Sequence, residues 1–146
     1  MDLEDLHKRL ARLEDIQEIQ QLVARYCEIC DYEDYDTDAL LQLFTVDATW
    51  DASFATVKGH DAIRALFAEF PNAIKRVQHI VANPQIVVEG DKARGSWYLI
   101  SAGEKTDGSM PKWPEIFARY HQDYVKQNGE WKICHLRVEA SRGSAE

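Results

Sequence analysis

The residues best suited to acid–base chemistry are a histidine, an acid and a tyrosine: His79, Asp31 and Tyr26. An imidazole titrates near neutrality, and a carboxylate that holds one ring nitrogen fixes the tautomer and stabilises the cation formed on proton uptake. A tyrosine hydroxyl can donate a hydrogen bond to a carbonyl or a leaving hydroxyl. This set predicts removal of a proton beside a carbonyl, followed by elimination or a double-bond shift, with no metal or organic cofactor.

Each of these residues also has an ordinary structural interpretation. A histidine such as His79 is more often a hydrogen-bonded residue of the core or of a sheet edge, and Asp31 alone is typical of a helix-end acid that faces water. The hypothesis therefore depends on a contact between the two side chains, because a buried carboxylate without a partner is costly.

The acid and the tyrosine belong to a stretch that is predicted to be one amphipathic helix. From Ile16 to Cys30 apolar residues recur every three or four residues, and Asp31 falls at the edge of this stripe. Leucines continue the spacing backward, so the helix is expected to begin near residue 3 and to run for about 28 residues. Its first turns either project and pack on another subunit, as a short coiled-coil-like seam, or lie on the same domain. The leucines are Leu3, Leu6, Leu10 and Leu13.

The second half of the chain has the alternating pattern of a long antiparallel sheet. Gly90-Asp91 and Asn128-Gly129 are tight-turn signals that join four β-like runs. The segment before them predicts two short helices, the first capped by Asp36 or Thr37, with a hairpin between the helices. Helices first and strands last indicate an α+β fold with helices on one side of a curved sheet. The β-like runs cover residues 77–89, 92–102, 115–127 and 130–140, the helices 37–44 and 59–70, and the hairpin 47–58.

Strand parity brings several side chains to the face that carries His79, where they are expected to line an apolar, aromatic cavity typical of a small-molecule site. His121 or His135 could add a second imidazole. The connection 103–114, with Met110 and Trp113, is either a lid over the cavity or a surface loop pinned by its tryptophan. The predicted lining is Trp50, Phe54, Val81, Trp97, Leu99 and Ser101.

Composition limits the classes of partner. The chain has 146 residues, enough for one domain, and its net charge of −8 disfavours nucleic acid and anionic membrane surfaces. No apolar run approaches the ~20 residues of a membrane span, and the N-terminus lacks a secretory apolar core, so a soluble cytoplasmic protein is expected.

Cys27 and Cys30 are interpreted as small core residues rather than a redox pair. No spacing in the sequence indicates a metal site, a phosphate loop or a serine nucleophile.

Several local motifs resemble the SnoaL-like branch of the NTF2-like superfamily. The resemblance covers nearly the whole chain and rests on the order and spacing of these motifs together. They are Ile19 to Asp31 with its Tyr-x4-Asp ending, Phe44 to Ala48, Gly59 to Ile63, Val77 to His79, Gly95 to Leu99, Tyr120-x3-Tyr124 and Asn128 to Trp131.

This resemblance implies a single domain over residues 1–146, a cone-shaped α+β barrel whose curved antiparallel sheet and N-terminal helices form one deep pocket. The family includes scytalone dehydratase, hexachlorocyclohexane dehydrochlorinase and bile acid 7α-dehydratase, lyases that use a His–Asp dyad. By position the dyad corresponds to His79 and Asp31, and the helix tyrosine of some dehydratases to Tyr26. Where these relatives carry a further acid or a second histidine on the fourth strand, this chain offers Ser101 or a neighbour.

The favoured function is a cofactor-independent lyase that performs a dehydratase-type elimination on a hydrophobic cyclic substrate. An isomerase or cyclase would use the same residues, and a non-catalytic ligand-binding or accessory domain would use the same fold. The expected partners are a small-molecule substrate and further copies of the chain, as a trimer or dimer, without nucleic acid, membrane, metal or organic cofactor.

Overall fold

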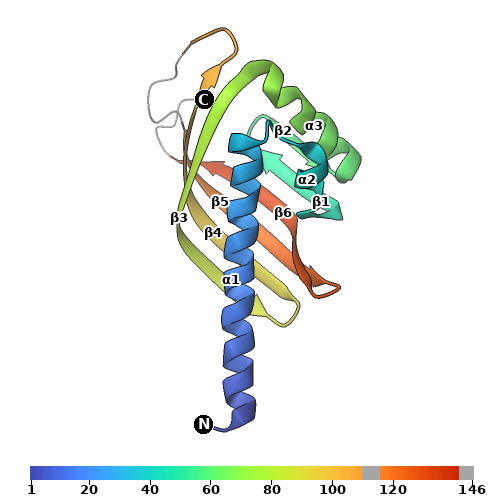
Figure 1. Cartoon of the computed structure of the whole chain (residues 1–146), viewed down its shortest axis with the longest axis vertical. Coiled ribbons are helices and arrows are strands. Elements are labelled where there is room, and N and C mark those ends of the chain that lie inside the picture. Colours follow the sequence, from blue (N-terminus) through green and yellow to red (C-terminus); the bar gives the residue numbers. More distant parts are fainter. Residues whose placement is uncertain (110–115, 142–146) are drawn as a thin grey trace.

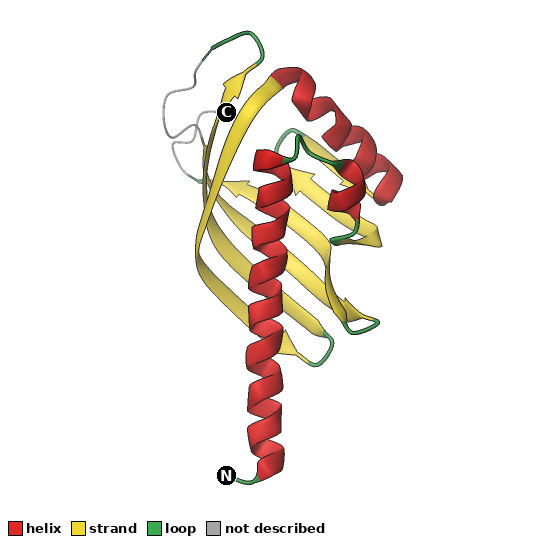
Figure 2. Cartoon of the chain, viewed as in Figure 1, coloured by secondary structure: helices red, strands yellow, loops and turns green. Residues whose placement is uncertain are grey.

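The computed structural model describes residues 1–109 and 116–141, and it places three helices on one side of a curved sheet (Figure 2). The α+β class expected from the sequence is confirmed. The helices are α1 (Leu3–Tyr32), α2 (Thr37–Leu41) and α3 (His60–Ala73), and the strands are β1 (Phe44–Ala52), β2 (Ala55–Lys58), β3 (Ile74–Glu89), β4 (Lys92–Lys105), β5 (Ile116–Gln127) and β6 (Glu130–Ala140).

The sheet is mixed and open, whereas the sequence predicted an antiparallel, barrel-like sheet. Its strand order is β2-β1-β6-β5-β4-β3, so β2 and β3 form its two edges. The meander from β3 to β6 is antiparallel as expected, but β1 runs parallel to β6. Pairing between strands so distant in sequence carries no local turn signal, and hairpin patterns alone could not reveal its direction.

Element boundaries differ from the predictions mainly at the ends of the long strands. β4 continues to Lys105, so the first part of the predicted lid is strand, and residues 110–115, with Met110 and Trp113, lie outside the described residues. Phe44 opens β1 rather than ending the second helix. The cap of that helix is Asp36, whose carboxylate accepts from the backbone N–H groups of residues 38 and 39.

Helix α1 crosses the concave face of the sheet and extends beyond it (Figure 1). Its C-terminal half packs on the sheet through Ile19, Val23, Tyr26 and Cys30, all of them buried. Residues 3–14 project past the sheet and are exposed, whereas packing of these turns on another subunit stays a prediction. Within residues 1–109 and 116–141, no helix combines the length and apolar character of a membrane span.

Candidate active site

Asp31, in the last turn of α1, meets His79 on β3. Only 3% of the Asp31 side chain is exposed, and its Oδ1 lies 2.5 Å from Nδ1 of His79. The other carboxylate oxygen accepts from the backbone N–H of His79 at 2.9 Å and from the side-chain amide of Gln78 at 3.1 Å. The desolvated carboxylate is therefore well supplied with hydrogen bonds, which offset the cost of its burial.

This geometry determines which nitrogen of His79 can act as a base. An ionised carboxylate only accepts hydrogen bonds, so Nδ1 carries the proton that is shared with Asp31. Nε2 is then the unprotonated nitrogen of the neutral ring. In the described part of the chain Nε2 makes no hydrogen bond, and His79 lines both a cavity under α3 and the hollow beside α1. The direct neighbour of His79 on β4 is Ser101, which lines the same cavity.

The cavity lies between the concave face of the sheet, the end of α1 and α3. Its volume is about 290 Å³. Its wall is mostly aromatic and aliphatic, with a few polar groups. Of the residues predicted from the sequence, those that line it are Tyr26, Trp50, Phe54, His79, Leu99 and Ser101.

Two predicted lining residues lie elsewhere. Val81 lies in a shallow hollow between α1 and β3, beside Asp31, because α1 covers that part of the sheet. Trp97 is 5% exposed and belongs to the packed core, where its indole donates to the Tyr124 hydroxyl at 3.2 Å. Strand parity placed both residues on the side of the sheet that faces the helices. Parity does not show which positions on that side are covered by a helix or by other core side chains and which border a cavity.

Tyr26 is one of the polar residues that line the cavity. Its hydroxyl accepts from the indole N–H of Trp50 at 3.2 Å, and its side chain is also hydrogen-bonded to Cys30. Burial raises the pKa of Tyr26 well above its ordinary value of 10. The phenol therefore keeps its proton at neutral pH.

Aromatic side chains that were not predicted as lining residues complete the cavity. Phe67 and Phe70 belong to α3, and they line the cavity because α3 packs across it. Tyr35 follows the end of α1 with a positive φ of 57°, in a segment that carries no periodic signal. Tyr120 contributes from β5. Their burial could be foreseen from their apolar pattern, whereas their approach to one cavity depends on tertiary packing.

Charged residues surround one part of the lining. Glu104, at the end of β4, contacts the cavity and makes ion pairs with Lys75 at 3.0 Å and Arg76 at 2.6 Å. Hydrogen bonds from these two cations lower the pKa of Glu104. The Glu104 carboxylate is therefore ionised at neutral pH and ion-paired with both cations.

The thiols of α1 are unsuited to redox or nucleophilic chemistry. Cys27 and Cys30 are free and buried, as the sequence indicated. Burial raises the pKa of Cys27 to about 12 and that of Cys30 well above 9, so both remain neutral thiols. Among the described residues there is no group of three or more His, Cys, Asp or Glu side chains arranged to hold a metal ion.

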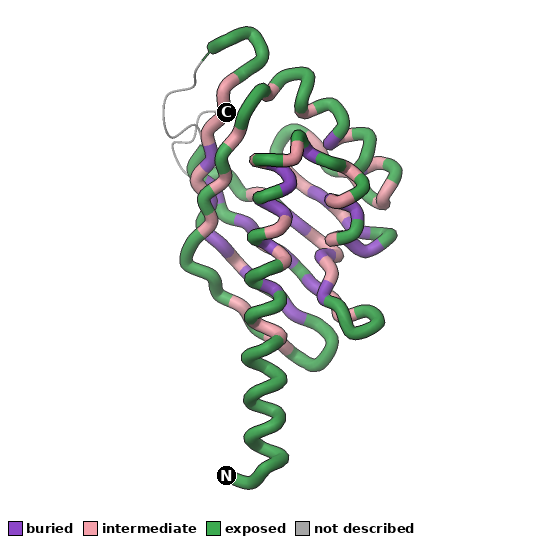
Figure 3. The backbone as a smooth tube through the Cα atoms, in the orientation of Figure 1, coloured by how far each residue is buried: buried purple, intermediate pink, exposed green. Residues whose placement is uncertain are grey.

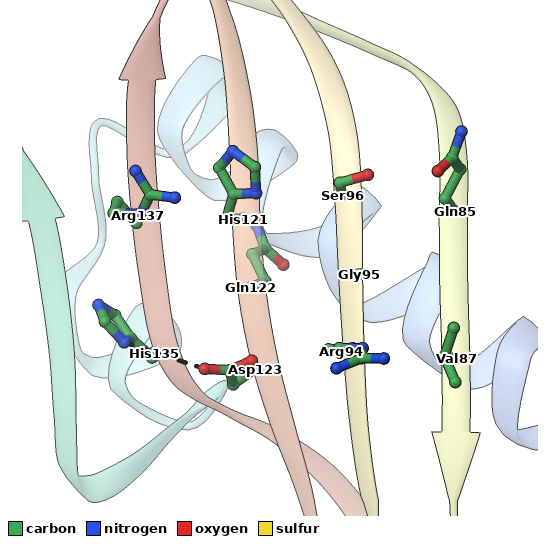
Figure 4. A pocket seen from close by; sticks show the side chains of 10 residues that line it. All are labelled: Gln85, Val87, Arg94, Gly95, Ser96, His121, Gln122, Asp123, His135 and Arg137. Carbon is green, nitrogen blue, oxygen red and sulfur yellow. Dashed lines mark ion pairs between the residues drawn. The ribbon is translucent and has the colours of Figure 1, made fainter.

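A second hollow, of about 400 Å³, lies on the outer face of the sheet, with the helices behind it (Figure 4). His121 and His135 both line this hollow and are absent from the lining of the inner cavity, contrary to the expectation for one of them. Nε2 of His121 lies 2.5 Å from Glu139, and His135 lies 4.0 Å from Asp123. Neither imidazole can therefore assist His79 directly.

Comparison with known protein families finds one match that covers most of the chain. Residues 11–137 match the SnoaL-like domain. A comparison with curated proteins finds no match.

Solved structures share the fold over nearly their whole length. An NTF2-like protein with a cystatin-like fold from Novosphingobium aromaticivorans is 27% identical, with a TM-score of 0.79 over 99% of this chain and 93% of that one. A hexachlorocyclohexane dehydrochlorinase of type 2 is 22% identical, with a TM-score of 0.78 over 91% and 89%. A protein of N. aromaticivorans DSM 12444 with the provisional name scytalone dehydratase is 18% identical, with a TM-score of 0.78 over 92% and 90%. At these identities the last two show a likeness of fold alone.

Proposed function

Because the chain belongs to the SnoaL-like family, whose fold it shares with dehydratase- and dehydrochlorinase-type proteins, we propose that it is a cofactor-independent lyase. His79 is the base, Asp31 orients it, and Tyr26 assists the oxygen that leaves or enolises. The observation that carries this proposal is the imidazole of His79, held at Nδ1 by a buried carboxylate in a residue that lines a mainly apolar cavity.

The proposed reaction is an elimination beside a carbonyl. Nε2 of His79 takes the proton from the carbon next to the carbonyl, and the electron pair of the broken C–H bond forms the C=C bond. The C–O bond at the neighbouring carbon breaks, and the hydroxide that leaves takes the proton back from the His79 imidazolium and departs as water, so the neutral ring is restored. Asp31 stabilises the imidazolium that forms, in the way a carboxylate supports a general base.

The cavity favours a small hydrophobic ring compound as substrate. A volume of about 290 Å³ is at the lower end of ligand pockets and suits one or two rings. Tyr26, His79 and Ser101 supply polar groups on an otherwise mainly apolar wall. The ionised rim residue Glu104, paired with its two cations, would disfavour burial of a charged group beside it.

Hydrogen exchange on probe compounds tests the reaction class before the substrate is known. The protein is incubated in D₂O with a panel of one- and two-ring β-hydroxy ketones, and NMR follows deuterium at the α-carbon and formation of the enone. We expect both with the wild type and neither with His79→Ala. Exchange without enone would instead favour an isomerase. Binding of a panel member without exchange would support a ligand-binding domain and would reject the lyase.

Asp31→Asn is expected to lower kcat roughly 10²-fold, because an amide neither fixes the same tautomer nor balances the imidazolium charge. The amide nitrogen would also face a donor, which costs about 1–3 kcal/mol of stability. Steady-state kinetics and thermal unfolding measure the two effects separately.

Asp34→Asn is the matched control, since Asp34 is exposed, lies three residues along the chain and has a positive φ that asparagine tolerates. Its kcat should equal that of the wild type. Equal kcat values for Asp31→Asn and Asp34→Asn would remove Asp31 from the mechanism.

A further inference from the structure

Four leucines on the projecting part of α1 are left uncovered by the described residues. Their exposures are 52–75%, and this part of the helix is exposed all round (Figure 3). A contiguous apolar stripe on an otherwise polar surface is typical of an interaction site. The leucines are Leu3, Leu6, Leu10 and Leu13, and together they are called the leucine stripe below.

The leucine stripe faces away from the chain's own sheet. At about 100° per residue, its mean direction lies roughly 150° around the helix from the buried face formed by Ile19, Val23, Tyr26 and Cys30. The rotation arises because Leu10, Leu13, Ile16 and Ile19 follow one another in steps of three. A molecule that covers the stripe therefore approaches from the side opposite the sheet.

Local interactions alone give this part of α1 little stability. The projecting turns contain an Asp2 cap on the backbone of Asp5 and an exposed Glu4–Lys8 ion pair. An isolated helix of this length is marginal in water, and an exposed ion pair contributes only a few tenths of a kcal/mol. Packing of the leucines against a partner would supply what is missing.

We propose that the leucine stripe pairs with the same stripe of a second copy of this chain, as a short parallel coiled coil over residues 3–14. The spacing of three, four and three residues places Leu3 and Leu10 at a positions and Leu6 and Leu13 at d positions. Since each stripe faces away from its own sheet, the two sheets lie on opposite outer sides of the helix pair.

Charge selects the second copy as the occupant and the parallel direction. In this register Arg9 is at a g position and Glu14 at the following e position, so each Arg9 faces Glu14 of the other copy. An antiparallel pair would instead bring Arg9 near Arg9 of the other copy. In the described structure Arg9 contacts only the sulfur of Met1, at 3.3 Å, so its guanidinium is available for this pairing.

Molar mass of the full-length protein in solution tests the leucine contact. We expect a dimer mass from size-exclusion chromatography with light scattering at about 100 μM, and a monomer mass for Leu6→Glu/Leu10→Glu. Thermal unfolding of this variant, followed by far-ultraviolet circular dichroism, should remain cooperative, which shows that the rest of the fold is retained. A monomeric wild type, or a double variant that keeps the dimer mass, would overturn the proposal. A double variant that does not unfold cooperatively is replaced by Leu3→Ser/Leu6→Ser, for which the same two outcomes apply.

Charge reversal tests the direction of the pair. Arg9→Glu and Glu14→Arg should each raise the dimer dissociation constant about tenfold, and the combined variant Arg9→Glu/Glu14→Arg should return it to near the wild-type value. Arg12→Glu, on the far side of the helix, is the matched control and should leave it unchanged. Single variants that behave like Arg12→Glu, or a combined variant that is weaker than either, would overturn the parallel arrangement.

Discussion

Replacement of His79 by glutamine is expected to lower kcat by about 10²–10⁴-fold, the usual contribution of a positioned general base. Glutamine fills much of the same space and can still donate to Asp31, but its amide cannot take a proton at neutral pH. The aromatic wall that binds the substrate is untouched, so KM should change by no more than about threefold. Steady-state kinetics on the compound found by the exchange experiment measures both constants.

The matched control is His121→Gln, which makes the same chemical change on the outer face of the sheet. We expect its kcat to equal that of the wild type. Thermal unfolding of both variants shows whether the fold is retained. A kcat for His79→Gln within about threefold of the control would reject the assignment of the base.

The helix that carries Asp31 could be predicted because its pattern is local. Apolar residues every three or four positions give the helix, and the phase of Asp31 places the acid at the edge of the buried stripe. The β3 run was also visible from its alternation, and His79 was a natural partner for the acid. Their contact was a hypothesis that needed coordinates, because no local rule relates a helix end to a strand 48 residues later.

Residues beyond the helix and strand were harder to place, because periodicity gives the face of a residue and not its depth. Val81 and His79 share a face and both line the hollow beside α1, yet only His79 also lines the cavity. Trp97 shares a face with Ser101 and is packed in the core. The parallel pairing of β1 with β6 is likewise a contact between distant segments, without a turn signal.

The leucine stripe shows the same limit within one helix. A spacing of threes and fours extends from Leu3 to Cys30, which suggested one continuous apolar face. Each step of three residues covers about 300°, which is about 60° short of a full turn of the helix. Three such steps in succession rotate the apolar stripe around the helix, so the apolar faces of the two halves of α1 point in nearly opposite directions. The sequence therefore contains two surfaces in this helix, one for the chain's own sheet and one that is left exposed.

Phe67→Ala is expected to destabilise the protein by about 3–5 kcal/mol, the range for truncating a fully buried phenylalanine. Phe67 is 1% exposed, and its ring centroid lies 5.0–6.3 Å from those of four other aromatic rings. For a chain of this size the loss corresponds to a Tm lower by roughly 6–20 °C. The rings concerned are Tyr26, Tyr35, Trp50 and Phe70.

Phe54→Ala makes the same chemical change at the edge of this cluster. Phe54 is 68% exposed and contacts only Trp50 and Phe70 among the described rings, so a loss of about 1 kcal/mol or less is expected. Thermal unfolding at one fixed protein concentration compares the two variants. Because Phe67 supports both Tyr26 and Trp50, its loss should also weaken binding of any ligand that Phe54→Ala still binds. A loss for Phe67→Ala as small as the ~1 kcal/mol expected for Phe54→Ala would mean that the cavity wall rearranges easily, and a preorganised site would then have no structural basis.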